Sequence, residues 1–298
     1  MESPSAHQLP ADAVLETVLG AYRMRVEIIA DVHFCGTWVE EEPAMRYGQF
    51  HLVTAGRCWV DGEVMGAPVL LEVGDVIVFP ASVRHQLRSS DNPCDDASQP
   101  PDTWMLCGEL EFITGAHNPI FQALPPWFVI RAAESSAGFR DLADMLAMAS
   151  RDRGWGRRLI QNKLADSFFT IAVCEYVRRA DRPQGLLAAL ADPRLSRVLG
   201  AVHQQPGHDW TLAAMAQLAG MSRTAFAELF SQTVGTPPIQ YLAHWRATEA
   251  RRLLRNRRFS VARVAEMLGY GSEAAFRRFF KRIEGEGPGK ARNRPDRD

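Results

Sequence analysis

Residues 215–235 of this chain read MAQLAGMSRTAFAELFSQTVG, and residues 264–285 read VAEMLGYGSEAAFRRFFKRIEG. The two stretches repeat one pattern, because three positions recur 50 residues apart: Phe226, Phe230 and Gly235 correspond to Phe276, Phe280 and Gly285. Gly220 recurs as Gly269, with one residue inserted in the turn. Apolar residues at helical spacing on both sides of each turn predict two copies of a short helix, a tight turn and a second helix.

A serine follows the turn in each copy. Ser222 and Ser272 are good helix N-caps, because a hydroxyl can accept a hydrogen bond from a free N–H of the first turn. This arrangement is a helix-turn-helix, whose second helix enters the major groove of DNA. Many helical hairpins share the pattern once, but two tandem copies joined by a helix over residues 238–255 are far more specific.

Residues 193–294 resemble the DNA-binding domain of the AraC/XylS transcription regulators. Trp245-Arg246 and the stretch 249–254 (EARRLL) are similar to the connecting helix of that family, and residues 261–272 (VARVAEMLGYGS) to its signature. One departure is Ala291, where members usually have Tyr; it affects the expected packing of the last turn and leaves the family assignment intact.

The aromatic pairs at i and i+4 predict which face of each second helix meets DNA. Phe226 and Phe230, like their counterparts, should face the core, which leaves the opposite face for the nucleic acid. The predicted DNA-binding residues of the first copy are Ser222, Arg223, Thr224, Ala227 and Glu228. Those of the second copy are Ser272, Glu273, Ala274, Arg277, Arg278, Lys281 and Arg282.

Arg278 ranks first for reading bases, because it aligns with a base-reading position of the family that the chain resembles. Arginine matches guanine O6 and N7 with its two-pronged guanidinium, and glutamate can accept from cytosine N4. Lys281, Arg282 and the cluster 251–258 (RRLLRNRR) are expected to contact phosphates, which position the protein without specifying sequence. For that cluster, a merely solvated helix end remains the alternative.

The charge distribution is consistent with an anionic partner. The chain has a net charge of -1, but residues 201–298 hold 16 Lys and Arg against 9 Asp and Glu, a net of +7. The first 200 residues carry the compensating -8. A basic module joined to an acidic one favours nucleic-acid binding by the basic half.

Residues 25–115 are predicted to be β-strands separated by turn signals, which indicates a small antiparallel sandwich or barrel. The expected strands are residues 25–29, 50–53, 57–60, 69–71, 76–79 and 104–112. His51 to Gly56, then Gly74-Asp75, Pro80 and His85, resemble the cupin fold. A cupin barrel is a concave container, and its rim here is expected to hold His51, Trp59, Arg84 and His85 as an effector pocket.

Metal-binding cupins supply a His-x-His pair and a Glu from their first motif. Here Val53 takes the place of the second His, so only His51 and His85 remain as candidates. A catalytic metal normally has three protein ligands, so we expect no metal, no cofactor and no catalysis in this barrel.

Beyond Pro126 the period changes to about 3.6, and residues 139–149 and 159–179 are expected to be amphipathic helices. They are interpreted either as packing on the barrel or as a dimer seam. The predicted organisation is a cupin-like sensor domain (1–115), a helical connector and possible dimerisation segment (116–190), and the double helix-turn-helix domain (191–298). The expected fold class is therefore α+β with two domains, and the expected state is a homodimer.

Five cysteines, without a C-x-x-C pair, argue against a disulfide framework and against a structural zinc site. Cys107 stands in an apolar strand, where a buried thiol is ordinary, and Cys94 stands in a polar loop. Cys94 with Cys107 is the candidate pair for oxidant sensing, and a structural role for each is the alternative.

The sequence thus predicts a transcription regulator that binds double-stranded DNA and senses a small molecule or an oxidant. We expect it to be cytoplasmic and not an enzyme, with RNA polymerase as a further partner. No apolar run approaches the roughly 18 residues that cross a bilayer, and the first 19 residues hold no basic residue of a secretory signal. The alternative from another class is a cupin-type metal-dependent enzyme with an accessory helical domain.

Overall fold

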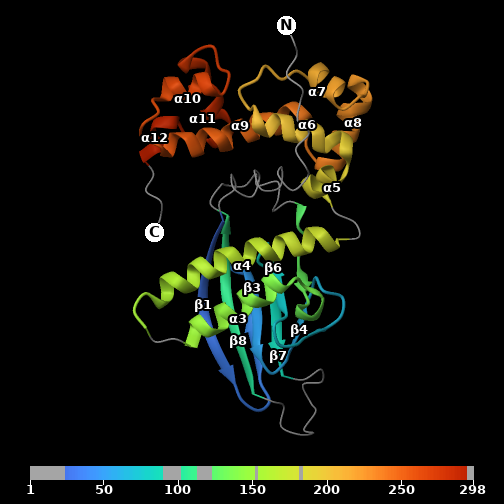
Figure 1. Cartoon of the computed structure of the whole chain (residues 1–298), viewed down its shortest axis with the longest axis vertical. Coiled ribbons are helices and arrows are strands. Elements are labelled where there is room, and N and C mark those ends of the chain that lie inside the picture. Colours follow the sequence, from blue (N-terminus) through green and yellow to red (C-terminus); the bar gives the residue numbers. More distant parts are fainter. Residues whose placement is uncertain (1–23, 90–101, 113–122, 152–153, 181–183, 294–298) are drawn as a thin grey trace. The chain divides into compact units, whose positions relative to one another are not determined.

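The computed structural model describes residues 24–89, 102–112, 123–151, 154–180 and 184–293 (Figure 1). They divide into two compact units: one holds the described residues of 24–113 and 124–181, and the other holds Ala123 and the described residues after 181. The first unit contains all the strands together with two long helices, and the second is helical. The predicted α+β fold with two domains is confirmed.

The strands form two antiparallel sheets. The five-stranded sheet has the order β1 (Met24–Phe34), β8 (Thr103–Phe112), β3 (Gly48–Ala55), β6 (Val76–Phe79) and β9 (Phe128–Ile130). The four-stranded sheet has the order β2 (Val39–Glu42), β7 (His85–Arg88), β4 (Cys58–Gly62) and β5 (Val69–Leu71). The six strands predicted from the turn signals are present, whereas β2, β7 and β9 were not predicted.

The core of this unit comes from alternate residues of the strands, because neighbouring side chains of a strand point to opposite faces. Ten buried side chains pack together: Val53, Cys58, Val60, Met65, Leu71, Ile77, Phe79, Leu87, Met105 and Cys107. They belong to strands of both sheets or to the turn after β4, so they join the two sheets.

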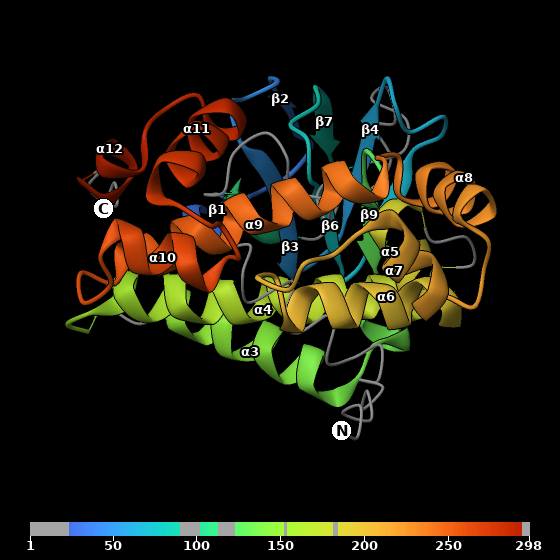
Figure 2. The ribbon, with the colours of Figure 1, turned by 90° about the horizontal axis from the view of Figure 1, so that it is seen from above.

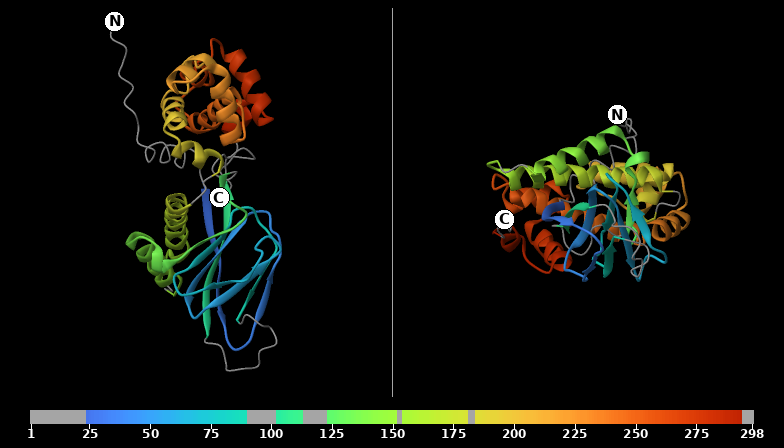
Figure 3. Two further views of the ribbon diagram at one scale, coloured as in Figure 1. Left: turned by 90° about the vertical axis from the view of Figure 1, so that its right-hand side faces the viewer. Right: turned by 90° about the horizontal axis from the view of Figure 1, so that it is seen from below.

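Two helices, α3 (Ala137–Arg151) and α4 (Arg157–Arg179), pack against each other and against one side of the strands (Figures 1 and 3). Phe139 and Phe168 meet between them, with ring centroids 4.9 Å apart. The backbone N–H of Val26 on β1 donates to Asp166 Oδ1 on α4 at 2.9 Å. These helices therefore belong to the strand unit, and their use as a dimer seam stays a prediction.

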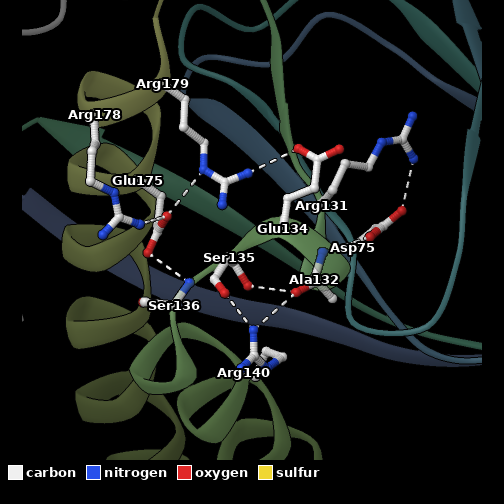
Figure 4. A network of polar contacts seen from close by, with 10 residues as sticks. All are labelled: Asp75, Arg131, Ala132, Glu134, Ser135, Ser136, Arg140, Glu175, Arg178 and Arg179. Carbon is white, nitrogen blue, oxygen red and sulfur yellow. Dashed lines mark hydrogen bonds and ion pairs between the residues drawn. The ribbon is translucent and has the colours of Figure 1, made fainter.

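A polar network fastens α4 to the segment that leaves β9 (Figure 4). The buried Glu175 carboxylate accepts from the Ser136 N–H at 3.1 Å and pairs with Arg178 and Arg179. On the other side of the short 3₁₀ helix η1 (Ala132–Glu134), buried Asp75 accepts from Arg131 at 2.7 Å. Buried carboxylates that are paired and hydrogen-bonded in this way fix the local geometry, because losing one partner leaves an uncompensated charge.

The second unit is a run of helices: α5 (Gly185–Ala191), α6 (Pro193–Gln204), α7 (Leu212–Leu218), α8 (Arg223–Val234), α9 (Pro238–Arg255), α10 (Val261–Met267), α11 (Glu273–Glu284) and α12 (Pro288–Asn293). Helix α9 joins the two halves of this unit (Figure 2). Helices α6, α7 and α8 lie at one end of it, and α10, α11 and α12 lie at the other. The pairs α7–α8 and α10–α11 are the two predicted helix-turn-helix copies, joined by the predicted connecting helix.

Both copies use the same local chemistry. The Ser222 hydroxyl accepts from the Ala225 N–H at 3.3 Å, and the Ser272 hydroxyl accepts from the Ala275 N–H at 3.2 Å. Helices α8 and α11 end at glycines with φ near +80° and +74°, a conformation that side chains with a Cβ rarely adopt. The predicted N-caps are therefore confirmed. No helix of the described ranges is long and apolar enough to span a membrane.

Candidate functional sites

The exposed faces of α8 and α11 present the side chains predicted to meet DNA. Phe226, Phe230, Phe276 and Phe280 are at most 2% exposed, as predicted, so each helix buries its aromatic face. Of the residues predicted on α8, Arg223, Thr224 and Glu228 are exposed and Ala227 is half-buried. On α11 they are Ala274, Arg277, Arg278, Lys281 and Arg282, with Glu273 half-buried.

The cationic side chains of α11 differ in whether they already have an ion-pair partner. Arg277 Nε donates to Glu273 Oε1 at 2.7 Å, an i,i+4 ion pair on the helix surface. Arg278 and Lys281 have no ion pair with any residue that the structure describes. Arg277 must therefore exchange a partner before it can bind DNA, whereas Arg278 and Lys281 need not.

The basic cluster 251–258 at the end of α9 is only partly available. Arg251 pairs with Glu284 of α11, and Arg252 pairs with Glu249 at 2.9 Å. The first pair ties the connecting helix to the second recognition helix. Arg257 and Arg258 lie beyond the end of α9 and are exposed, so they are the better candidates for phosphate contacts.

A second candidate site lies inside the strand unit. His51 of β3, His85 of β7 and Cys107 of β8 are each at most 5% exposed and come from different strands. Cys107 Sγ lies 3.1 Å from His51 Nδ1, and His51 Nε2 lies 2.8 Å from His85 Nε2. His85 Nδ1 in turn lies 2.8 Å from the Val83 carbonyl oxygen, and the ring of Phe79 stacks on His85.

This chain of contacts fixes where the hydrogens lie. The Val83 carbonyl can only accept, so His85 Nδ1 carries a hydrogen and His85 Nε2 of the neutral ring accepts. His51 Nε2–H then donates to His85, and His51 Nδ1 is left as the acceptor. We therefore assign the thiol of Cys107 as the donor to His51, at the start of a relay that ends at Val83.

Burial keeps all three groups neutral. It lowers the pKa of His51 to about 3, with the neighbouring His85 as a second cause, and it also lowers the pKa of His85. Burial likewise raises the pKa of the Cys107 thiol, with the Glu42 carboxylate adding to the effect. The cluster is a hydrogen-bonded relay of three uncharged groups.

An open cleft of about 430 Å³ borders His85. It is lined by Glu41, Asp61, Gly62, Glu63, Arg84, His85 and Gln86. Of the four predicted pocket residues, Arg84 and His85 line it, whereas His51 lies buried and Trp59 lies on β4 with its ring facing Arg88. The three acidic residues were not predicted, because isolated carboxylates at strand ends carry no sequence signal.

The cysteines separate into different environments. Cys58 is fully buried and donates to the Trp59 carbonyl, and burial raises the pKa of its thiol to about 12. Cys107 is the buried thiol that contacts an imidazole. Cys94, its predicted partner, lies outside the described residues.

Comparisons with known proteins match both units. Residues 13–178 match a cupin family, and residues 215–294 match a helix-turn-helix domain family. A putative AraC-like transcription regulator of Streptomyces lividans is 30% identical over 298 residues, which cover 94% of this chain and 98% of that protein.

Two further likenesses are more distant or more partial. The RCS-specific HTH-type transcriptional activator RclR of Escherichia coli is 29% identical over 252 residues, 83% of this chain and 84% of that protein. A further match is the crystal structure of the DNA-binding domain of AdpA, the global transcriptional factor, in complex with a target DNA. Its sequence is 33% identical to the matched part of this chain. It covers 34% of this chain and 90% of that chain, with a TM-score of 0.32.

Proposed function

Because the chain belongs to the family of AraC-like transcription regulators, we propose that its helical unit binds an operator and that its cupin-like unit controls this binding. Helices α8 and α11 enter successive major-groove segments of an asymmetric site, about one helical turn apart. RNA polymerase is a further partner in this proposal, and the cytoplasm is the compartment. The relatives are transcription regulators, and we therefore propose that this chain is also a regulator and not an enzyme.

The signal in this proposal is an oxidant that reacts with Cys107. The observation that carries it is the contact between a thiol and an imidazole, Cys107 Sγ to His51 Nδ1 at 3.1 Å, inside a sensor-type fold. The thiolate is the reactive form and burial disfavours it, so the reaction requires the thiol proton to pass to His51, and the His51 proton to His85, as the oxidant arrives. The name of the Escherichia coli relative, an RCS-specific activator, supports this assignment.

The chemistry balances without another co-reactant. A peroxide or hypochlorite transfers oxygen to sulfur, so the thiol becomes a sulfenic acid and the oxidant is reduced to water or chloride. With hypochlorous acid one proton is also released, and it passes to solvent because burial lowers the pKa of both histidines. A bulkier, polar sulfur in a close-packed core then forces β3 and β8 to adjust, which is the change that the DNA-binding unit would sense.

Reporter expression from the native promoter, with and without hypochlorite or peroxide, tests this proposal. We expect Cys107→Ser to abolish the response and His85→Gln to weaken it, because the relay is interrupted. Cys58→Ser is the matched control, since Cys58 is equally buried but contacts a carbonyl oxygen and no imidazole. An unchanged response in both Cys107→Ser and Cys94→Ser would end the oxidant version.

A small polar effector in the cleft is the second candidate function. Glu41, Asp61 and Glu63 outnumber the single cation Arg84 in its lining, which favours a ligand with a positive charge or several hydrogen-bond donors. If this version holds, Glu63→Gln changes the response of the same reporter while Cys107→Ser leaves it intact. Loss of response in Cys107→Ser would contradict it.

We also propose a homodimer formed through the region of α3 and α4. Three large apolar side chains at the end where these helices connect are strongly exposed: Met148 (63%), Leu159 (66%) and Trp155 (103%). Large apolar side chains exposed close together in the sequence, at one end of a helix pair, favour a protein–protein interface there. Sedimentation of the full-length protein should show a dimer that Leu159→Glu dissociates. A monomer at tens of micromolar would remove the proposal.

A further inference from the structure

A cluster of three side chains of metal-ligating type lies outside both candidate sites, at one end of the β1–β8 pair. His33 is the penultimate residue of β1, Cys35 follows the strand directly, and Asp102 precedes β8. The antiparallel register places Phe34 opposite Thr103, so Asp102 comes to the same end of the pair as Cys35. All three side chains are exposed, and one ligand atom of each lies within 4.8 Å of the others.

The local backbone and a neighbouring ring hold the imidazole of His33 in place. His33 and Cys35 are two residues apart, the spacing that puts side chains on one face of an extended chain. The ring of Trp104 stacks on that of His33 at 4.1 Å with an interplanar angle of 13°. His33 Nε2 lies 3.3 Å from Asp102 Oδ2, and Cys35 Sγ lies 3.6 Å from Nε2 and 4.0 Å from Nδ1 of the same ring.

These separations can be compared with a tetrahedral zinc site. Zinc binds cysteine sulfur at about 2.3 Å, histidine nitrogen at about 2.05 Å and carboxylate oxygen at about 2.0 Å. With angles near 109°, the same distances require about 3.6 Å between nitrogen and sulfur and about 3.3 Å between nitrogen and oxygen. Both edges have these lengths in the free side chains, but Cys35 Sγ also lies 4.0 Å from His33 Nδ1, whereas sulfur on a zinc ion bound in the ring plane at Nε2 lies about 5 Å from Nδ1. The exposed Cys35 side chain must therefore rotate for an ion to enter, while the strands keep their places.

We propose that His33, Cys35 and Asp102 form a zinc-binding site, with water as the fourth ligand. The donor set of one thiolate, one imidazole and one carboxylate matches the preference of Zn²⁺ over harder cations, which take only oxygen. The ion joins the end of β1 to the start of β8. The site is distinct from the buried pair of His51 and His85, whose Nε2 atoms face each other and are occupied by their mutual hydrogen bond.

The protonation chemistry of the cluster fits this assignment. A thiol binds zinc as the thiolate, so the proton of Cys35 must leave when the ion binds. Two neighbouring groups that cannot easily both be negative are stabilised together by a divalent cation. Zinc binding should therefore release the thiol proton, and its affinity should fall as the pH is lowered.

Titration of the chelator-treated full-length protein with Zn²⁺ tests the site, followed by calorimetry and, with Co²⁺, by absorbance. We expect one saturable ion per chain at micromolar concentration, and a sulfur-to-cobalt charge-transfer band that disappears in Cys35→Ser. His33→Gln and Asp102→Asn should weaken binding by more than the roughly 10–100-fold that loss of an outer-shell partner costs. Because the three side chains are exposed, these variants should fold.

Matched control variants distinguish zinc binding at this site from zinc binding elsewhere on the chain. Cys174→Ser removes another thiol, and Asp31→Asn removes an exposed carboxylate of the same strand, so both should bind zinc like the parent protein. Binding that requires millimolar zinc, or that survives Cys35→Ser, would overturn the proposal. Loss of binding in His85→Gln with Cys35→Ser unaffected would place the ion at the buried histidines and would equally overturn it.

Discussion

The two helix-turn-helix copies share one interior and differ in their exteriors. Phe226 and Phe276 are both fully buried, and α8 and α11 have the same serine cap and the same left-handed glycine at their ends. Their outer faces are unlike, because α8 holds Arg223 and Glu228 as its charged residues, a net of zero. Helix α11 holds four cations and two acids, a net of +2. A repeated fold can therefore carry two different recognition surfaces.

The packing beneath the two copies also differs. Under the first copy, buried His203 hydrogen-bonds the Tyr241 hydroxyl at 2.8 Å and packs against Trp245. The position 50 residues after Tyr241 is Ala291, which packs with the core of the second copy. The first copy thus contains a buried polar pair where the second has only the methyl group of Ala291. The alanine that stands where family members usually have Tyr is therefore accommodated by packing of a small side chain.

The shared interior predicts equal costs for core truncation. Phe226→Ala and Phe276→Ala should each destabilise their copy by about 3–5 kcal/mol, because each removes a fully buried ring and leaves a cavity. Hydrogen exchange of the amides of α8 and α11 measures the opening free energy of each copy. A cost below about 1 kcal/mol in one copy would show that the two cores are not equivalent.

The buried histidine predicts that the first copy is more sensitive to acid. Burial lowers the pKa of His203 from 6.5 to about 3, so between these values the unfolded chain binds a proton that the folded chain does not. Stability should therefore fall as the pH drops through this window, by up to about 1.4 kcal/mol per pH unit. Exchange rates in α8 and α9 should show this slope, and His203→Gln should remove it. An equal slope in α11 would contradict the comparison.

The equivalent caps predict equal and smaller effects. Ser222→Ala and Ser272→Ala should each cost about 1 kcal/mol, within a range of about 0.5–2, because each leaves an N–H of the first turn without its acceptor. The same exchange measurement applies. The Gly versions should cost only a few tenths of a kcal/mol; a Gly variant as damaging as the Ala variant would exclude the capping explanation.

The unlike exteriors predict a difference in salt dependence. Lys281→Ala should lower the slope of log affinity against log salt by about one unit and weaken all DNA sequences alike, since it removes one phosphate contact. The corresponding position of the first copy is Ser231, so Ser231→Ala should leave the slope unchanged. Fluorescence anisotropy at several salt concentrations gives both values, and equal slopes for the two variants would contradict the assignment of phosphate contacts to α11.

Periodicity and turn residues were sufficient to predict the helical unit, because its contacts are local and its repeat is explicit. They also located six strands, but β7 was missed since His85–Arg88 is short and lacks a run of β-branched residues. The candidate sensor was predicted only in part, because His51, His85 and Cys107 were each named as candidates but not as one cluster. Cys107 and His51 lie 56 residues apart and meet only through the β3–β8 register, which places them directly opposite each other.

The same limit explains why the proposed zinc-binding site was not predicted from the sequence. The sequence argument against zinc considered pairs of cysteines, whereas this site combines one cysteine with His33 and with Asp102, which lies 67 residues after Cys35. The ion pair on the recognition helix α11 is a different case, because its signal is local. Arg277 is four residues from Glu273 and Arg278 is five, so helix spacing alone could have predicted that Glu273 holds Arg277, as the structure has it.

The central claim is that the second copy reads bases through Arg278, and selection of bound DNA from a randomised library tests it most directly. Full-length protein, Arg278→Ala and Glu228→Ala are compared, because Glu228 occupies the corresponding position of the first copy. We predict that Arg278→Ala costs about 1–3 kcal/mol and relaxes the preference at one base pair, while Glu228→Ala keeps the preference of the second half-site. An operator preference left intact by Arg278→Ala would contradict the account.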